Sequence, residues 1–181
     1  MRAPHDLALV EPQVSLFEAF AAMSDDYRRA GETRYQHAGG WTPARFEKYL
    51  VELADNAQGL HLPPNRTPQA TFWLVESGRS IVGVSRLRPI LNEHLRNEGG
   101  NIGYDVPPSK RRLGFGTELL RLVLLKAAAM GLETVLVTCG KGNTGSRKVI
   151  EANGGVLAEE GLSAKDGTPL LRFWIMLAPA P

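Results

Sequence analysis

The spacing of apolar positions predicts two amphipathic helices near the N-terminus, preceded by a short strand. An apolar run at residues 7–10, ended by a Glu-Pro pair, indicates the strand. Apolar side chains at helical spacing predict a helix over residues 14–29. Thr42 and Pro43 are typical of a helix cap and a first helical position, and the apolar face that follows reaches about residue 57. The N-terminal part of the chain is therefore expected to be mainly helical.

The rest of the chain alternates strand and helix patterns. Residues 58–69 contain three prolines and one glycine and are expected to form a loop. Two apolar runs on either side of Ser77-Gly78-Arg79 predict a hairpin. Later, a largely apolar helix follows a glycine-bearing loop and ends at Gly131. The expected elements here are strands at 70–76, 80–88, 101–106, 135–138, 156–160 and 170–177, helices at 117–130 and 144–153, and a loop or short helix at 89–100.

The order β-α-α-β-β-β-α-β-α-β-β predicts a three-layer α/β or α+β domain, with a mixed sheet and helices on both faces. The strand at 135–138 is expected to run parallel to the preceding strand, because a helix connects the two. With 181 residues, of which 43% are apolar, the chain is long enough and apolar enough for one domain with a substantial core.

Composition narrows the class of protein further. The formal net charge of +2 is too small to indicate nucleic-acid binding, and no apolar run approaches the length of about 18 residues that a membrane span needs. No long apolar core follows Arg2, so we expect no signal peptide. Cys139 is the only cysteine, which excludes an internal disulfide, and we expect it to be a small buried apolar residue. These features fit a reducing cytoplasm, and we expect neither a membrane nor a nucleic acid as partner.

Residues 106–118 have the composition of an anion-binding loop. The loop leads from a strand into a helix, whose first N–H groups are unpaired and carry the positive end of the helix dipole. Gly114 and Gly116 let a ligand approach the backbone closely, and the basic residues 110–112 add positive charge. Neither the P-loop pattern nor the dinucleotide-binding glycine pattern is present, since Leu119 stands where the latter needs glycine.

The pattern that does fit is Arg-x-x-Gly-x-Gly at residues 111–116, which resembles the acetyl-coenzyme A pyrophosphate loop of the GNAT N-acetyltransferase superfamily. Two flanking segments strengthen the resemblance. Residues 101–106 are similar to the family's central strand, and residues 143–154 are similar to its Asn-x-x-Ser/Ala helix. The resemblance covers residues 70–177 well, and it implies that the whole chain is one acetyltransferase domain with an N-terminal helical part at about residues 1–58.

The resemblance implies the acyl-CoA N-acyltransferase fold, in which two parallel strands splay apart and the pantetheine arm of acetyl-CoA enters the gap. Backbone groups of residues 104–106 would bond the pantetheine amides. Asn143 would contact the cofactor arm, although it also suits a helix cap. No metal is expected. The cofactor-binding residues that the resemblance implies are Tyr104, Asp105, Val106, Arg111, Arg112, Leu113, Gly114, Phe115, Gly116, Thr117, Asn143 and Ser146.

Two positions depart from the family pattern. Ile150 stands where many members have the tyrosine that protonates the departing thiolate, so Ser146 or water would serve instead. Asn101 stands where many relatives have glutamate. An asparagine cannot accept a proton at neutral pH, but it could orient a water molecule.

The general base is less well defined by the sequence than the cofactor loop. The candidate catalytic residues are His94, Glu93 and Ser146, with Glu98 and Asp105 as further candidate bases. His94 has the most suitable unperturbed pKa. Glu93 and Glu98 can also be ordinary solvated charges of the loop. The hydroxyl of Tyr104 makes it a further possibility, but core packing is the more natural use of this side chain.

We therefore expect an enzyme that transfers the acetyl group of acetyl-CoA to an amine by direct attack on the thioester. A non-catalytic CoA-binding or sensor domain on the same fold is the alternative, because the usual tyrosine and glutamate are missing. A module that binds phosphate ligands or nucleic acid would explain only the basic loop. The acceptor stays open among peptides, lysine, polyamines, antibiotics and small amino compounds, and such a domain can also form a homodimer.

Overall fold

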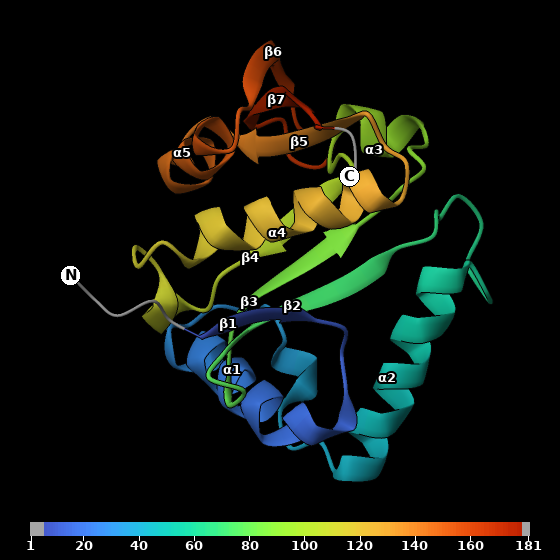
Figure 1. Ribbon diagram of the computed structural model, residues 1–181, viewed down its shortest axis with the longest axis vertical. Helices are drawn as coiled ribbons and strands as arrows, with labels where there is room; N and C mark the ends of the chain where they lie inside the picture. Colours follow the sequence, from blue (N-terminus) through green and yellow to red (C-terminus); the bar gives the residue numbers. More distant parts are fainter. Residues whose placement is uncertain (1–5, 179–181) are drawn as a thin grey trace.

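The structure, a computed structural model, describes residues 6–178. Its elements follow the expected order, and the segment at 89–100, expected to be a loop or short helix, contains a short helix before the fourth strand (Figure 1). The strands are β1 (Leu7–Val10), β2 (Ala70–Glu76), β3 (Ser80–Leu87), β4 (Ile102–Asp105), β5 (Thr134–Gly140), β6 (Val156–Leu162) and β7 (Pro169–Met176). The helices are α1 (Phe17–Arg29), α2 (Pro43–Gln58), α3 (Glu93–Asn97), α4 (Phe115–Ala129) and α5 (Thr144–Ala152), with short 3-10 turns η1 (Val14–Leu16), η2 (Gln36–Ala38) and η3 (Pro108–Lys110).

Ladder hydrogen bonds divide the strands into two antiparallel sheets. The first sheet has the order β1-β2-β3-β4 and the second the order β5-β7-β6. Strands β4 and β5 lie at the boundary and run toward the same end of the molecule (Figure 1). The expected fold class is confirmed, including the separation between two parallel strands that the resemblance implied. Each half of the divided sheet is antiparallel throughout.

Asn101 joins the two sheets at the start of β4. Its backbone N–H donates to the carbonyl oxygen of Leu136 at 2.8 Å, and its side-chain Oδ1 accepts from the Leu136 N–H at 2.8 Å. Its Nδ2 donates to the carbonyl oxygen of Arg88 at 2.9 Å. Gly100, with a φ of +63°, precedes this joint, and a Cβ at that position would collide with the Leu136 carbonyl group. The close approach and the left-handed backbone therefore both require glycine.

Two apolar cores lie on opposite faces of the first sheet. One contains the buried face of α4 and the inner faces of both sheets, with Leu119 and Phe173 fully buried. The other packs α1 and α2 against the remaining face, where Phe20 stacks on Trp73 with ring centroids 5.5 Å apart. Helices on both sides thus hold β4 in place, while its end next to β5 stays open.

Local sequence explains where most elements begin and end. Thr42 caps α2 as predicted, since its side chain accepts from the Arg45 N–H at 3.3 Å. Gly131, with a φ of +83°, follows the last turn of α4, also as predicted. Helix α4 begins at Phe115 rather than at residue 117, because Gly114 adopts a φ of 88° and turns the chain directly into the helix.

Candidate functional site

A cavity of about 830 Å³ opens where β4 and β5 separate. Its walls come from the end of β4, the loop through η3, the first turns of α4 and α5, and the loop that follows α1. Ten of the predicted cofactor-binding residues line the cavity: Tyr104, Asp105, Val106, Arg111, Arg112, Gly114, Gly116, Thr117, Asn143 and Ser146. Segments far apart in the sequence therefore converge on one site.

The N-terminus of α4 forms one end of the cavity. No side chain of the described residues caps this helix, so its first N–H groups are available to an anion. Gly116 lies on the cavity wall, and a Cβ there would approach Val149 Cγ2 to 3.2 Å. A larger residue at this position would crowd the passage between the two helices.

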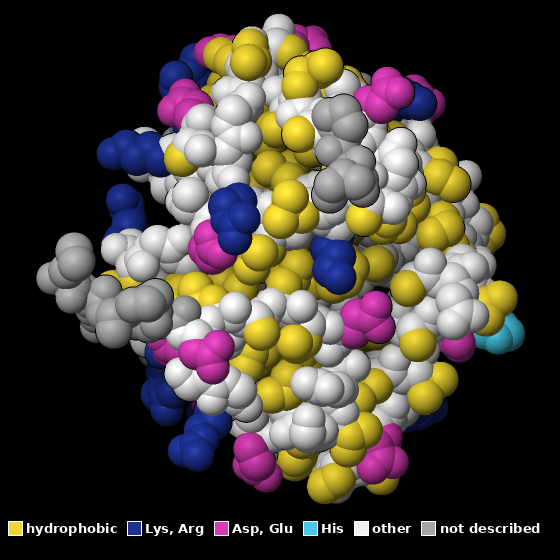
Figure 2. All heavy atoms as spheres, in the orientation of Figure 1, with side chains coloured by type: hydrophobic (Ala, Val, Ile, Leu, Met, Phe, Trp, Pro, Cys, Tyr) yellow, Lys and Arg dark blue, Asp and Glu magenta, His cyan; other side chains and the backbone are white. Residues whose placement is uncertain are grey.

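Basic side chains surround this end of the cavity, and Figure 2 shows Lys and Arg gathered along the matching edge of the molecule. Arg112 and Lys148 line the cavity and form no ion pair with the described residues. Lys110 is paired with Glu76 at 3.1 Å. The unpaired charges and the uncapped helix together favour an extended anion such as a diphosphate.

Arg111 is held by an acidic partner that the sequence analysis missed. Its guanidinium donates to both carboxylate oxygens of Glu32, at 2.6 and 2.8 Å, and its Nε donates to the carbonyl oxygen of Val106 at 3.0 Å. The hydrogen bond from Arg111 holds the pKa of Glu32 below its usual range. Glu32 follows α1 and is distant in sequence from the basic loop, so no local pattern could have identified the pair.

Asp105 is the centre of a buried polar network. Its carboxylate accepts from the hydroxyls of Tyr27 and Tyr35 at 2.8 and 3.0 Å, and from the guanidinium groups of Arg86 and Arg34 at 2.7 and 3.2 Å. Burial and the neighbouring Asp105 charge raise the pKa values of both tyrosines. Because four donors saturate the carboxylate, Asp105 fixes the loop after α1 against β4 and is unsuited to accept a proton from a substrate. This network argues against Asp105 as a general base, a role that stays an untested prediction.

Two hydroxyls meet at the other end of the cavity, where the strands diverge. The Tyr104 hydroxyl lies 2.8 Å from Ser146 Oγ and donates to the Ser146 carbonyl oxygen at 3.2 Å. Burial raises the pKa of Tyr104 to about 12. Asn143 caps α5, since its side chain accepts from the Ser146 N–H at 3.0 Å, and it also lines the cavity. The two uses of Asn143 that the sequence left open are thus compatible.

Other predicted residues lie outside the cavity. Glu93 and His94 are exposed on α3 and do not line the cavity. Leu113 is largely exposed, and Phe115 is buried in the core, so their side chains also lie outside it. The side chain of Ile150 is fully buried in the same core.

Two residues from the sequence analysis have structural explanations. Glu98 accepts from Ser163 Oγ and from the Ala164 N–H, each at 3.0 Å, which ties the end of α3 to the β6–β7 turn. Asn101 uses its side chain to join the sheets, as described above, so it is not placed to orient a water molecule. The absence of a strand glutamate at this position is therefore explained by architecture.

No group of three or more histidine, cysteine, aspartate or glutamate side chains in residues 6–178 is arranged to hold a metal ion. Across the same residues, no helix combines the length and the apolar character needed to cross a membrane.

Comparison with known proteins agrees with the geometry. A family model for the acetyltransferase (GNAT) domain matches residues 6–156. A search of curated proteins found no match to the sequence. RimJ from Mycobacterium smegmatis, solved with CoA-disulfide, superimposes with a TM-score of 0.69 at 16% identity, covering 94% of this chain and 81% of that one.

Two further solved structures have the same fold. The microcin C7 self-immunity acetyltransferase MccE, solved with acetyl-CoA and AMP, gives a TM-score of 0.65 at 12% identity, with 94% of this chain and 92% of that chain covered. A chimera of the spermidine N-acetyltransferase SpeG from Vibrio cholerae and hSSAT gives 0.62 at 14% identity, with 94% and 95% covered. At these identities the superpositions establish the fold.

Proposed function

The chain belongs to the GNAT acetyltransferase family, and from that premise we propose that it transfers an acetyl group from acetyl-CoA to a primary amine. Family membership and the fold support acetyl-CoA-dependent acetyl transfer in general. The choice of an amine as acceptor, direct attack on the thioester and a cytoplasmic location are our inferences. The observation that carries the proposal is a cavity with an uncapped helix N-terminus at one end and a fork between two parallel strands at the other.

We propose that the diphosphate of acetyl-CoA binds the N-terminus of α4, with Arg112 and Lys148 as counter-charges. The pantetheine arm would then extend along β4, where residues 104–106 line the cavity. No ladder joins β4 and β5 in the described part of the chain, so backbone groups of β4 on the side facing β5 are available to the amides of the arm, apart from the Val106 carbonyl oxygen, which accepts from Arg111. The thioester would lie at the fork.

The reaction at the fork needs no covalent intermediate. The acceptor nitrogen attacks the thioester carbonyl carbon, the C–N bond forms and the C–S bond breaks, and the electron pair of that bond leaves on sulfur. The proton that the amine loses passes to solvent or to the thiolate, which gives an amide and CoA. Ser146 is our candidate for the group next to the sulfur. Basic roles for His94 and Glu93 stay predictions, and both side chains would need a water-mediated path from α3.

Binding and turnover test the proposal separately. Isothermal titration with acetyl-CoA should show saturable binding, and Gly116→Ile should abolish it, because the new side chain fills the space between Val106 and Val149. Gly142→Ala, on the same cavity wall but with no atom within 4 Å of the added Cβ, is the matched control. Release of CoA thiol in the presence of a panel of primary amines then measures transfer.

A non-catalytic CoA-binding domain is the second candidate. It is favoured by the presence of isoleucine instead of tyrosine at position 150 and by the saturation of Asp105, because neither side chain is then suited to assist proton transfer. This candidate predicts acetyl-CoA binding with no thiol release above the buffer rate for any amine. Absence of binding by the wild-type chain would contradict both candidates.

A further inference from the structure

Arg88 is a partly buried arginine whose hydrogen-bond partners carry no charge. It directly follows β3. Its Nε donates to Gln69 Oε1 at 2.9 Å, and one terminal nitrogen donates to the Gly100 carbonyl oxygen at 3.3 Å. Among the described residues, both acceptors of its side chain are therefore neutral, and most of its N–H donors stay available to a ligand. Because proteins seldom bury an arginine without a counter-charge, this position needs an explanation.

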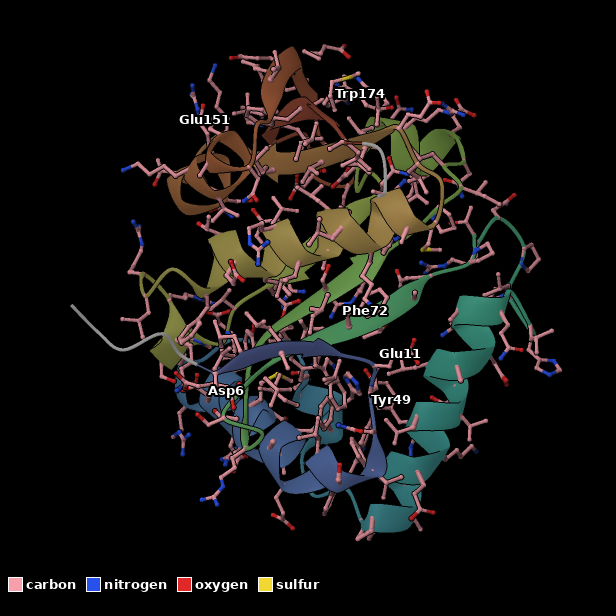
Figure 3. All side chains as sticks on the ribbon, in the orientation of Figure 1. Asp6, Glu11, Tyr49, Phe72, Glu151 and Trp174 are labelled. Atoms are coloured by element: carbon pink, nitrogen blue, oxygen red, sulfur yellow. The ribbon has the colours of Figure 1, made fainter. Side chains whose placement is uncertain are left out.

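The guanidinium of Arg88 lies over β4, on the face of the first sheet that packs against α1 and α2. Arg86, two positions earlier, reaches Asp105 on that face, and Tyr49 extends from α2 toward it (Figure 3). The Cβ that Gly103 of β4 lacks would lie 3.6 and 3.7 Å from the two terminal nitrogens of Arg88. The guanidinium therefore covers a stretch of strand backbone that carries no side chain of its own.

This position is next to the fork but outside the cavity that we assign to the cofactor. Arg88 does not line that cavity, whereas Tyr104, the neighbour of Gly103 in β4, does. Tyr104 packs against the core on the α4 side, so its side chain and the guanidinium of Arg88 lie on opposite faces of β4. An acceptor that approaches the thioester from the α1–α2 face would therefore pass the free donors of Arg88.

The charges around Arg88 favour an anionic ligand. The carboxylate of Asp105 pairs with both Arg86 and Arg34, so this cluster has an excess of positive charge even before Arg88 is counted. Burial, and then the charges of Arg86 and Arg66, lower the pKa of Arg88 to about 10, which leaves its guanidinium charged at neutral pH. A carboxylate bound here would supply the counter-charge that the described residues do not provide.

We propose that Arg88 binds a carboxylate of the acceptor, so that the substrate is an amine that also bears a carboxylate, as in an amino acid or a peptide with an acidic residue beside its amino terminus. This inference rests on the proposed function and names its substrate class. The backbone of Arg88 is already fixed, because its N–H donates to the Asn101 carbonyl oxygen at 2.8 Å and its carbonyl oxygen accepts from Asn101 Nδ2 at 2.9 Å. Donors fixed in advance lose little freedom when the ligand binds.

The test compares carboxylates with their uncharged amide counterparts. The probes are L-amino acids and ω-amino acids of increasing length in one arm, and short peptides with an acidic residue beside the amino terminus in the other. Each probe is matched with the amide that replaces its carboxylate. In the CoA-saturated chain, proton–nitrogen NMR follows the Nε–H signal of Arg88, which is identified by its absence from Arg88→Gln and Arg88→Lys. We expect at least one carboxylate to shift this signal saturably and to bind about 10- to 100-fold more tightly than its amide.

Substitution of Arg88 separates recognition of the carboxylate from a purely structural role. Arg88→Gln should weaken binding of that carboxylate about 10- to 100-fold in ligand-observed NMR, and should change binding of its amide and of CoA by less than about threefold. Arg79→Gln removes the same charge from the exposed β2–β3 turn and should change none of the three. The inference is overturned if no carboxylate shifts the Arg88 signal, if amides bind equally well, or if Arg88→Gln weakens both classes alike. A failure of the wild-type chain to bind CoA would overturn the proposed function instead.

Discussion

Asn101 is the position at which a single side chain decides whether the two sheets stay in register. Its carboxamide occupies a site that is 4% exposed, and it links Leu136 of the second sheet to Arg88 of the first. We predict that Asn101→Ala destabilises the protein and weakens CoA binding together, because the joint sets the angle at which β4 and β5 diverge.

The expected loss follows from the hydrogen bonds that the truncation removes. Alanine leaves the Leu136 N–H without its side-chain partner in a buried site, and the Arg88 carbonyl group without its partner in a partly buried one. Each such group costs up to about 1–3 kcal/mol, so the free energy of unfolding should fall by roughly 2–6 kcal/mol. For a domain of this size, each kcal/mol corresponds to about 2–4 °C, which predicts a drop in Tm of about 4–24 °C.

Urea denaturation followed by tryptophan fluorescence provides the measurement, since Trp73 lies in the first sheet and Trp174 in the second. Asn92→Ala is the matched control. Its side chain also makes two hydrogen bonds, but one is exposed and the other is only partly buried, so water replaces them and the loss should be about 1 kcal/mol. The reasoning is refuted if Asn101→Ala costs less than about 1 kcal/mol or no more than Asn92→Ala.

Three further predictions follow from other contacts. Gly100→Ala should lower the Tm far more than Gly154→Ala, because both glycines have a positive φ but only the first would place a Cβ against backbone atoms; circular dichroism melts compare them. Glu32→Gln should destabilise the protein slightly at neutral pH and not at all in acid. The reason is that Arg111 lowers the pKa of Glu32, so the stabilisation from the ion pair is lost as pH falls through that lowered value. Urea titrations at several pH values between about 3 and 7 measure the difference in the free energy of unfolding between the two proteins, and a difference that is absent at neutral pH or persists in acid would contradict the prediction. Saturating CoA should raise the pKa of Glu32, measured by carboxyl NMR, since the diphosphate competes for Arg111. The exposed Glu118–Arg121 pair lies outside the cavity and is the internal control, so the pKa of Glu118 should not change. An unchanged pKa of Glu32 would mean that its pair with Arg111 persists in the complex and would contradict the prediction.

The loop at residues 106–118, whose residues line the cavity, could be predicted from sequence because its chemistry is local. Strand, basic turn, glycines and apolar helix are contiguous, and residues 106–118 fold within one supersecondary unit. The catalytic residues were harder to predict. Glu93 and His94 are suitable in residue type, but α3 presents them to solvent outside the cavity.

The remaining site residues could not be identified, because they depend on contacts between distant segments. Glu32 meets Arg111 across 79 positions, and Tyr27 meets Asp105 across 78. Neither residue carries a recognisable motif, and each is an ordinary helix or loop residue in the linear chain. Burial likewise reversed the interpretation of Asp105, since a carboxylate surrounded by four donors cannot act as a free base.

By itself, the order of apolar and polar residues predicted the succession of helices and strands, and the residues at 111–116 with their flanking segments carried the family resemblance, because these properties depend on neighbours within a few turns of chain. Only the tertiary structure decided how the two sheets are joined beside their split, which charges are neutralised and which hydroxyls face the fork. Those outcomes arise from packing and desolvation between segments that the linear sequence keeps apart, as the joint at Asn101 and the Tyr104–Ser146 pair illustrate.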